Sequence, residues 1–488
     1  MYNVCIIGAG VIGTAIAREL SKYNLNILLL EKAEDVGNGA TKANSGIVHG
    51  GYTAKNGTLK GSLSISGNRM FKELQKELNF EYKQIGSLVL AFEESELPLL
   101  EELQRNGESN GVNGLEIIGS DEIQKREPNV SEAAVAALFC PETGIVSPYE
   151  FCIALAENAV QNGVDLKLQS RVKKITKEES AFTIETVENL YQAELVINAA
   201  GVYSDKIAQM VGDMSIEIIP RKGEYIVFQR GQGEFINSVV FQVPSKRGKG
   251  VLVTPTCWNN LMIGPNSEEI PAPDDTSTNV ERLKYIVRTA KKSVPDFDLQ
   301  KMIRTFSGIR ATEKSRDFVI RQSEVSGFVH AAGIDSPGLT SAPAIAEKVV
   351  EICGEAGLVL KKKKSFHKNR KAITRYSKLK PFSEVKDLIS LEEGVSHRIV
   401  CRCEQVSEGT IVDALHRGIA VNSLDAVKRR TRAGMGACQG EFCGSRVKKL
   451  IARETGLSEA EVFTKGEGED VLAKRVDPTS YKSLLEDE

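Results

Sequence analysis

The sequence predicts an α/β protein in three parts: a nucleotide-binding domain with a parallel sheet, a lobe built on an antiparallel sheet, and a small helical C-terminal domain. The chain opens with an apolar strand, a glycine turn, an amphipathic helix and a second apolar strand. Short apolar runs separated by turn residues follow in its middle third, as in antiparallel sheets. Four of the nine cysteines gather in the last fifth of the chain, which favours a separate unit there.

The composition is that of a globular protein with more than one domain. At 488 residues the chain is long enough for two or three domains, and its charged content of 26% is ordinary. The formal net charge of −2 gives no reason to expect nucleic acid as a partner. No apolar run reaches the ~18 residues that a membrane-spanning helix needs, and the first strand begins at once, without a signal peptide. We therefore expect a cytoplasmic protein with reduced thiols.

The opening stretch, residues 3–32, has the pattern of a Rossmann-type nucleotide-binding unit. In its turn, Gly8 allows the tight bend, Gly10 lets the backbone approach a pyrophosphate, and Gly13 lets the helix pack closely on the strand. The N-terminus of the helix offers free N–H groups to the phosphates. Glu31, at the end of the second strand, is placed to hold the hydroxyls of an adenosine ribose. A tight turn in an ordinary α/β domain is the alternative. The order of strand, glycine turn, helix, second strand and terminal acid favours a site for an ADP-containing dinucleotide.

A loop rich in small residues follows, with the sequence GNGATKANSGIVHGG over residues 37–51. Such runs are commonly surface loops. This loop directly follows the nucleotide-binding unit, however, and contains His49, one of only five histidines. Because small residues let a backbone lie close along a flat ligand, we expect the loop to contact the cofactor.

The remaining elements of the first two parts are predicted in chain order. Helices are expected over 59–78, 97–106 and 148–161, a strand over 86–92, and an antiparallel meander over 165–190. A buried strand and a second glycine turn follow over 194–205. Three short strands at 224–228, 250–254 and 261–265 predict the antiparallel lobe, with a basic hairpin or solvated turn at 245–250. Residues 328–350 repeat the strand, glycine turn and helix, and this helix would add partial positive charge beside the cofactor.

From residue 361 the chain is basic and has little periodicity, which predicts a linker or a wrapping arm; a membrane or nucleic-acid role is the alternative. Beyond it, Cys401 and Cys403 form a CxC pair, and Cys438 and Cys443 form a CxxxxC pair. Four thiolates can hold a structural zinc or a 2Fe–2S cluster. Neither pair has the CxxC spacing of zinc ribbons, and the glycine-rich loops around them offer backbone N–H groups to cluster sulfides. The pattern therefore favours 2Fe–2S, with zinc and free thiols as alternatives.

Taken together, five of these segments resemble the D-amino-acid-oxidase-type FAD oxidoreductases. They are residues 3–32, NSGIVHGG at 44–51, VINAAG at 196–201, SGIR at 307–310 and IDSPGLT at 334–340. The resemblance covers residues 1–355 and is greatest to FAD-dependent glycerol-3-phosphate dehydrogenases and oxidases and to L-2-hydroxyglutarate oxidoreductases.

The cysteine segment, residues 401–447, resembles the bacterioferritin-associated-ferredoxin-type 2Fe–2S domain, which the large subunit of anaerobic glycerol-3-phosphate dehydrogenase also carries. The two resemblances imply an oxidoreductase domain over 1–355 with interleaved nucleotide and substrate lobes. A basic linker over 356–395, a 2Fe–2S domain over 396–455 and a tail over 456–488 complete the predicted organisation.

The resemblance implies which residues hold FAD. The glycine turn and Glu31 would bind its ADP half, the loop around Thr41 to Ile47 would lie beside the isoalloxazine, Val172 would meet the adenine, and the turns at Gly201 and Gly338 would close the far side. The implied set is Gly8, Ala9, Gly10, Val11, Ile12, Gly13, Glu31, Lys32, Thr41, Asn44, Ser45, Gly46, Ile47, Val172, Ala200, Gly201, Gly308, Gly338, Leu339 and Thr340.

The resemblance also implies catalytic residues. His49 matches the active-site histidine, and a histidine suits the base that an alcohol oxidation needs because it titrates near neutral pH. A histidine that only hydrogen-bonds the flavin or the product carbonyl is the alternative. Arg310 matches the arginine that holds the anionic end of the substrate, with Lys249 and Ser336 as helpers. The loop NSGIVHGGY is closer to the oxidase and 2-hydroxyglutarate branches than to the anaerobic large subunit.

The function implied is oxidation of sn-glycerol 3-phosphate to dihydroxyacetone phosphate by hydride transfer to flavin. Electrons would pass through the cluster to a partner, either a second flavoprotein or a membrane-linked subunit that holds the protein at the membrane surface. Oxidation of L-2-hydroxyglutarate is one alternative, because a guanidinium suits carboxylate and phosphate alike. Oxidation of an amino or imino acid and a non-catalytic electron-transfer module are the others.

Overall fold

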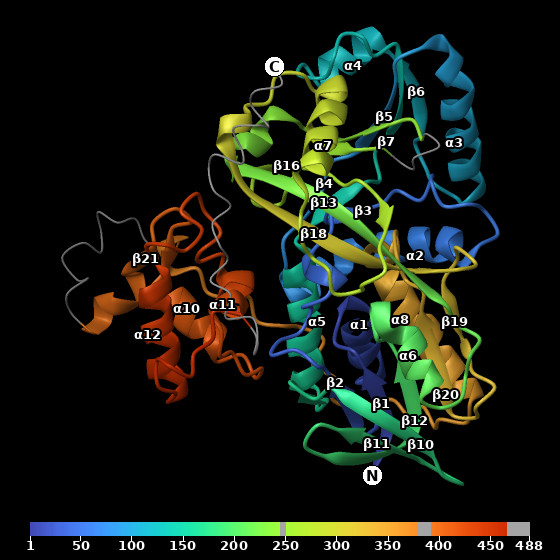
Figure 1. Cartoon of the computed structure of the whole chain (residues 1–488), viewed down its shortest axis with the longest axis vertical. Helices are drawn as coiled ribbons and strands as arrows, with labels where there is room; N and C mark the ends of the chain where they lie inside the picture. The colour runs from blue at the N-terminus through green and yellow to red at the C-terminus, as the bar shows by residue number, and fades with distance from the viewer. Residues whose placement is uncertain (245–249, 379–391, 466–488) are drawn as a thin grey trace.

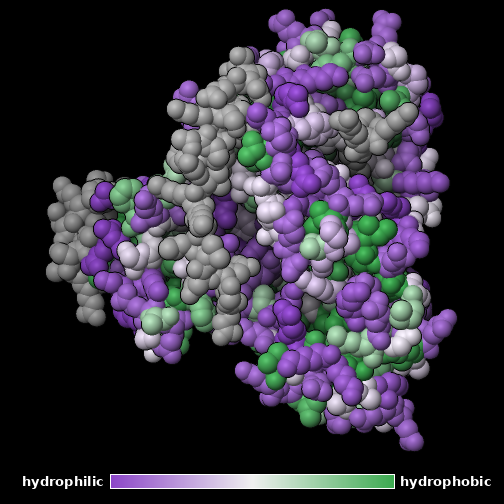
Figure 2. Space-filling model, viewed as in Figure 1, coloured by the Kyte–Doolittle hydropathy of each residue, from purple (hydrophilic) through white to green (hydrophobic). Residues whose placement is uncertain are grey.

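The computed structural model describes residues 1–244, 250–378 and 392–465. It has three parts, which Figure 1 shows from one side. The nucleotide-binding domain lies at the bottom of that view, the antiparallel lobe lies above it, and the cysteine-bearing C-terminal domain lies beside them at the left. On the face drawn in Figure 2, hydrophobic residues form small groups separated by hydrophilic ones. None of the helices within the described residues is long and apolar enough to span a membrane.

The nucleotide-binding domain is organised on an eight-stranded sheet with the order β10-β11-β12-β1-β2-β9, to which β20 and β19 add beside β12. The parallel strands are β1 (Tyr2–Ile7), β2 (Ile27–Leu30), β9 (Asp165–Lys167), β12 (Leu190–Asn198) and β20 (Phe328–Ala332). The antiparallel ones are β10 (Val172–Lys177), β11 (Phe182–Thr186) and β19 (Val319–Gln322).

Four helices cover one face of this sheet: α1 (Val11–Leu20), α2 (Leu59–Leu78), α5 (Pro148–Gln161) and α8 (Gly338–Glu355). The strands are buried on both faces, so alternate residues of β1 pack in two different clusters. Val4 and Ile6 contact the helical layer, whereas Cys5 and Ile7 pack with side chains from β10, β11 and α6 (Ser204–Gln209). This burial explains the continuous apolar runs of the sequence.

The predicted meander over 165–190 is wrong in its first part. Residues 165–167 form β9, which runs parallel to β2, and only β10, β11 and β12 make antiparallel pairs. The reason is the preceding helix, because α5 crosses over the sheet and returns the chain in the parallel direction.

The antiparallel lobe contains a nine-stranded sheet with the order β17-β13-β16-β15-β14-β5-β7-β6, and β18 pairs on β13. Two long strands connect it to the nucleotide-binding domain: β13 (Ile218–Arg230) and β18 (Met302–Glu313). The shorter strands are β5 (Ser87–Ala91), β6 (Glu116–Gly119), β7 (Ala136–Cys140), β14 (Val239–Gln242), β15 (Leu252–Pro255), β16 (Asn260–Gly264) and β17 (Glu268–Glu269). The predicted strand 224–228 is therefore the end of a much longer one.

Three helices border the lobe. They are α3 (Leu97–Ser109), α4 (Ser120–Arg126) and α7 (Val280–Ser293). Only the first of these helices is predicted from the sequence. A small three-stranded sheet of β3 (Ile47–Val48), β8 (Gly144–Val146) and β4 (Tyr82–Gln84) joins the lobe to the loop that contains His49.

The chain after α8 forms a wrapping arm rather than a loose linker as far as residue 378. Its backbone bonds the nucleotide-binding domain at three points, where Asn24, Lys22 and Glu77 lie opposite. Arg370 is buried there and donates to Glu157 on α5 at 2.6 Å. The C-terminal domain follows, with a hairpin of β21 (Ile399–Cys401) and β22 (Val406–Ser407) and the helices α10 (Glu408–Leu415), α11 (Leu424–Thr431) and α12 (Gly444–Thr455). These helices pack on a small apolar core of their own.

Candidate active site and cluster site

A continuous cavity of about 2850 Å³ runs between the nucleotide-binding domain and the antiparallel lobe and reaches the C-terminal domain. Its volume exceeds the range of roughly 300–1,000 Å³ that is usual for small-ligand pockets. Such a space suits an extended dinucleotide with a substrate beside it. Lys249 and the rest of the predicted hairpin up to residue 249 lie outside the described residues.

The glycine turn at one end of the cavity is shaped for a pyrophosphate. Gly8 has φ +103°, and a Cβ there would lie 2.5 Å from the Ala199 carbonyl oxygen. A Cβ on Gly13 would lie 1.9 Å from the Gly8 carbonyl oxygen, so helix and strand can meet only at glycine. Helix α1 begins after Gly10 without a side-chain cap, which leaves N–H groups of its first turn for an anion.

Glu31 closes the ADP end of the cavity. Its carboxylate accepts the backbone N–H of Ala9 at 2.8 Å and that of Ala33 at 3.0 Å, and it lines the cavity. Burial raises the pKa of this carboxyl, while the two backbone donors and Lys32 oppose that change. The carboxylate thus steadies the glycine turn and keeps lone pairs for ribose hydroxyls.

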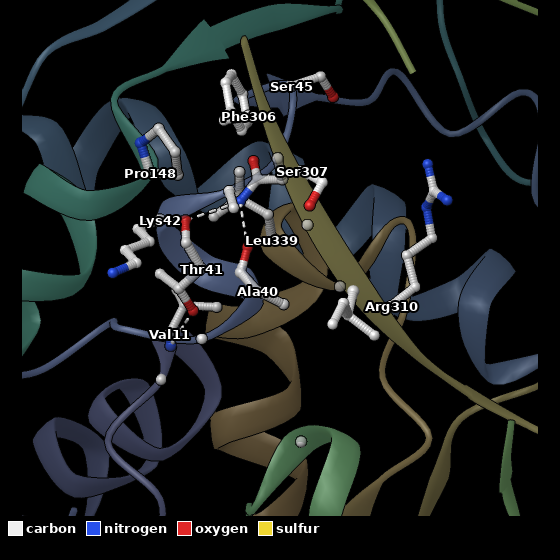
Figure 3. Close-up of a pocket in the computed structure, with 18 of the residues that line it drawn as sticks. Val11, Ala40, Thr41, Lys42, Ser45, Pro148, Phe306, Ser307, Arg310 and Leu339 are labelled. Atoms are coloured by element: carbon white, nitrogen blue, oxygen red, sulfur yellow. Dashed lines mark hydrogen bonds between the residues drawn. The ribbon is translucent and has the colours of Figure 1, made fainter. Parts of the chain in front are cut away.

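The middle of the cavity is a narrow slot between the loop after Gly39 and strand β18. Figure 3 shows Thr41, Ser45, Pro148 and Phe306 around it, with Val11 below. A Cβ on Gly308 would lie 1.8 Å from the Ala43 carbonyl oxygen, so the strand meets the loop at backbone distance. A flat ring system fits such a slot, because the backbone and small side chains of the loop border it together with the rings of Pro148 and Phe306.

His49 and Arg310 both line the cavity. The His49 Nε2 atom is 3.4 Å from the Ser336 hydroxyl, and the His49 ring stacks on Phe241 with 6.3 Å between ring centroids. The His49 backbone N–H donates to the Thr340 hydroxyl at 2.9 Å, which ties this residue to the start of helix α8. The sequence patterns that contain His49 and Ser336 are therefore brought together across 287 positions of the chain.

Arg310 extends from β18 and lines the cavity, as Figure 3 shows. Its guanidinium donates to the Ser267 hydroxyl and to the Asn266 carbonyl, both at 3.4 Å. A Cβ on Gly223 of the neighbouring strand β13 would lie 2.7 Å from an Arg310 nitrogen, so the glycine leaves room for the Arg310 guanidinium. The long bonds leave donors for an anionic ligand.

Most of the implied FAD residues line the cavity, namely Gly8, Gly10, Val11, Ile12, Glu31, Lys32, Thr41, Asn44, Ser45, Gly46, Ile47, Ala200, Gly201, Gly308, Gly338 and Leu339. Ala9, Gly13 and Thr340 lie behind the wall, where they shape the turn and hold His49. Val172 is buried in the sheet, and its neighbours Leu168, Gln169 and Arg171 line the cavity. The residues present fit FAD.

The four cysteines form two pairs. The Cys403 and Cys438 sulfurs are 3.7 Å apart, and the Cys443 thiol donates to Cys401, which lowers the pKa of Cys401 to about 6. Backbone N–H groups of Gly434 and Glu404 point at Cys401, and those of Gly440 and Phe442 point at Cys438.

Two thiol pairs suit a 2Fe–2S cluster, in which each iron takes two thiolates. A tetrahedral zinc would need all four sulfurs at one point. The donor set therefore fits the cluster better than zinc.

The C-terminal domain docks on the nucleotide-binding domain through buried charges. Arg430 of α11 donates to both oxygens of Asp35, at 2.6 and 2.8 Å, and neither side chain is exposed at all. Arg429 adds an ion pair with Asp35 at 2.9 Å and donates to the Val36 carbonyl. Figure 1 shows α11 lying next to α5 at this junction.

The same junction brings residues to the cavity that the sequence analysis does not single out. Tyr149 and Trp258 line the cavity from the oxidoreductase side, and Arg432 and Met435 line it from the C-terminal domain. Trp258 is the only tryptophan of the chain. A single tryptophan in the turn between two short apolar strands was a usable signal, because tryptophan buries a large surface yet needs a partner for its N–H.

Comparison with known proteins identifies the families of the two matched regions. The model of the family described as FAD dependent oxidoreductase matches residues 3–352, and that of the BFD-like 2Fe-2S binding domain matches residues 399–453. The chain is 46% identical over 473 residues to a glycerol 3-phosphate dehydrogenase of Caloramator mitchellensis, covering 97% of this chain and 98% of that protein. It is 32% identical to a glycerol 3-phosphate oxidase of Mycoplasma genitalium, over 75% of this chain and 97% of that protein.

Among solved structures, the fold is similar to that of a dithionite-reduced L-alpha-glycerophosphate oxidase from Mycoplasma pneumoniae with FAD bound. The TM-score is 0.72 at 31% identity, and the match covers 76% of this chain and 98% of the other.

Proposed function

Because the chain belongs to the FAD dependent oxidoreductase family and also contains a BFD-like 2Fe-2S binding domain, we propose that it is a dehydrogenase of sn-glycerol 3-phosphate. The product is dihydroxyacetone phosphate, and the electrons leave through the cluster. The two family matches confirm the predicted FAD and 2Fe–2S cofactors. The substrate follows the similarity to the Caloramator mitchellensis dehydrogenase, which extends over both domains.

The observation that carries the proposal is the contact of His49 with Ser336 in the same cavity that Arg310 lines. FAD, once bound, accepts the hydride from the substrate carbon. Arg310 binds the phosphate with its planar fork and so fixes the distance from the anion to the reacting carbon. His49 takes the hydroxyl proton at Nε2, and the Ser336 hydroxyl steers that nitrogen toward the substrate.

The proposed acceptor of the electrons is a separate protein that takes one electron at a time. The Cys403 and Phe442 side chains are exposed, Phe442 to 79%, so the outer edge of the cluster loop is open to a partner in the described structure. A cytoplasmic location agrees with this reading, because thiolates that hold a cluster must stay reduced. Any contact with a membrane would then be made by the partner.

The test is anaerobic bleaching of the bound flavin by sn-glycerol 3-phosphate, with L-2-hydroxyglutarate as the comparison substrate. We expect His49→Gln to bind FAD normally and to lose roughly 100-fold or more in the bleaching rate, since the base is gone. Arg310→Gln should raise the substrate concentration needed for half-maximal rate far more than it lowers the limiting rate.

The controls are His416→Gln and Arg288→Gln, whose side chains are exposed and lie outside the cavity lining. Wild-type bleaching in His49→Gln would contradict the assignment of the base. Bleaching by L-2-hydroxyglutarate alone would keep the chemistry and reassign Arg310 to a carboxylate. Fast peroxide formation without cluster reduction would contradict the dehydrogenase reading.

A further inference from the structure

The wall between the flavin slot and the cluster contains one short segment of the C-terminal domain, residues 432–439. Three of its residues, Arg432, Met435 and Gln439, line the cavity. The same segment ends at the cluster, because Cys438 is one of the four cysteines. The two cofactor sites therefore share this segment as a common wall.

Met435 contacts the flavin side of the wall. The Tyr149 hydroxyl lies 3.5 Å from the Met435 sulfur. Tyr149 follows Pro148, and a Cβ on Gly46 of the flavin loop would lie 3.5 Å from the Pro148 ring. From the loop beside the slot to the thioether, the path runs through the hydrogen bond from the Val146 N–H to the Gly46 carbonyl at 2.7 Å, the chain from Val146 to Tyr149, and the contact between Tyr149 and Met435.

On its other side, Met435 is joined directly to the cluster loop. The next residue is Gly436, where a Cβ would lie 2.2 Å from the Cys403 Cβ. Only glycine lets the backbone reach that cysteine. The Gln439 amide also donates to the Gly436 carbonyl at 2.8 Å, which folds the loop back onto Cys438. The distance from the thioether to the thiol pair is therefore spanned by covalent bonds and one backbone contact.

Both ends of the segment are held in place. Arg432 donates to Glu404 at 2.7 Å and to Asn260 of the oxidoreductase domain at 3.1 Å, and its guanidinium lies over the Trp258 ring at 5.0 Å. At the other end, Arg304 donates to the Gln439 side chain at 3.2 Å. A segment fixed at both ends keeps the Met435 side chain at one distance from the slot.

We propose that Met435 is the bridge through which electrons pass from the flavin to the Cys403–Cys438 side of the cluster. This inference rests on the proposed function. Tunnelling falls steeply with any gap not spanned by bonds or contacts, and the sequence Tyr149, Met435 and Gly436 connects the cavity lining to the loop that contains Cys438 by bonds and contacts. A polarisable thioether is also well suited to fill such a junction.

The electrons balance as follows. Each substrate gives up a hydride, which carries two electrons and one proton to the flavin, and a second proton to His49. The two electrons then cross one at a time. Each reduces the oxidised cluster by one electron, and an external one-electron acceptor, ferricyanide in the test, reoxidises the cluster between the two transfers. The proton of the reduced flavin returns to solvent.

A second route would run through Trp258, Arg432 and Glu404, the neighbour of Cys403. It includes an ion pair between Arg432 and Glu404, and the Trp258 N–H is committed to Glu150 at 3.1 Å. We regard it as the competing path, and the experiment separates the two.

The experiment uses the holoprotein under anaerobic conditions and follows flavin bleaching by absorbance and cluster reduction by freeze-quench electron paramagnetic resonance. The variants are Met435→Ala, Met435→Leu and Trp258→Phe, with Met214→Ala, a methionine that is 74% exposed, as the control. We expect Met435→Ala to slow cluster reduction about tenfold or more, Met435→Leu to slow it less, and the control to match wild type.

Two further readouts make the result decisive. Trp258 emission of the cofactor-free protein should be the same in wild type and Met435→Ala, which shows that the domain junction is intact. A laser flash that photoreduces the bound flavin with EDTA starts the same transfer without any substrate. If the flash shows slow transfer in Met435→Ala while no substrate bleaches the wild type, the bridge stands and the proposed substrate fails.

Cluster reduction at the wild-type rate in Met435→Ala would overturn the proposal. Slowing by Trp258→Phe with no effect of Met435→Ala would assign the transfer to the competing path.

Discussion

The buried ion pair between Asp35 and Arg430 gives the sharpest prediction. Asp35 accepts two N–H donors from Arg430 and forms an ion pair with Arg429, and all three side chains are almost completely withdrawn from water. Burial alone would raise the pKa of the Asp35 carboxyl, but Arg430 and Arg429 hold it below its usual range. Asp35→Asn removes the negative charge and leaves two buried guanidinium groups without it.

The expected cost follows from the asymmetry of buried ion pairs. Removing one partner of a buried pair costs roughly 3–5 kcal/mol, whereas replacing both partners by apolar residues of similar volume is often close to neutral. We therefore expect Asp35→Asn to lower the free energy of unfolding by about 3 kcal/mol or more. The double variant Asp35→Leu with Arg430→Met should lose clearly less free energy of unfolding than either single variant. Glu73→Gln, at a surface pair exposed by more than half, should lose only about 0–1 kcal/mol.

Urea unfolding of the cofactor-free protein, followed by Trp258 emission and by circular dichroism, measures these differences. Because Trp258 lies at the domain junction, its transition reports undocking even where the chain is not two-state. The difference in unfolding free energy between wild type and Asp35→Asn should be present at pH values above the unfolded pKa of about 3.9 and should shrink as the pH falls below it. The reason is that a lowered folded-state pKa means that the fold favours the ionised carboxylate, which protonation removes. An Asp35→Asn variant no weaker than Glu73→Gln would refute the reasoning, as would a double variant as costly as the singles.

Two further predictions concern other residues. Burial raises the pKa of Glu150 to about 7. Since this folded-state pKa lies above the unfolded one, its stabilising contribution is complete at low pH and is lost as the pH rises toward 7. The free energy of unfolding of Glu150→Gln should therefore rise by roughly 2–3 kcal/mol relative to that of wild type between pH 5 and pH 8, measured by urea unfolding. A difference between the two proteins that stays the same over this pH range would contradict the prediction. A Cβ on Gly67 would lie 2.1 Å from the Thr340 carbonyl oxygen, so Gly67→Ala should push α8 away from α2 and slow flavin bleaching. The control is Gly119→Ala, where a Cβ would meet open space and the bleaching rate should not change. Equal bleaching rates in the two variants would contradict the packing argument.

The parts of the site that the sequence predicts are those whose chemistry is local. The glycine spacing over Gly8 to Gly13 and the four cysteines carry their meaning within a few residues, because one turn or one loop must present them. The element boundaries of α2 and α5 are also predicted to the residue, since each begins and ends at clear changes of periodicity. The roles of His49 and Ser336, by contrast, depended on the family resemblance, and their contact was not predicted because the two side chains meet only in the fold.

The contacts between the C-terminal domain and the nucleotide-binding domain could not be predicted from the sequence. Asp35 stands in the charged run EKAED, and Arg429 and Arg430 stand in KRRTR, which are patterns typical of solvated surface. Nothing local shows that they are buried, because each charge is acceptable there only through a partner about 395 positions away. The helix α7 was missed for a related reason. Its apolar residues are few, and they matter only against the sheet that they cover.

The buried charges also explain why the C-terminal domain would serve the flavin so directly. An apolar junction can slide and still exclude water, whereas Arg430 and Asp35 lose their pairing in any other register. We infer that α11 fixes the domain in one orientation, and with it the segment 432–439 that closes the cavity wall. A cluster held by a free tether would meet the flavin only at the rate of the tether's search. With the domain fixed, the transfer distance is constant. Asp35 should therefore affect cluster reduction before it affects flavin bleaching, even though it touches neither cofactor site.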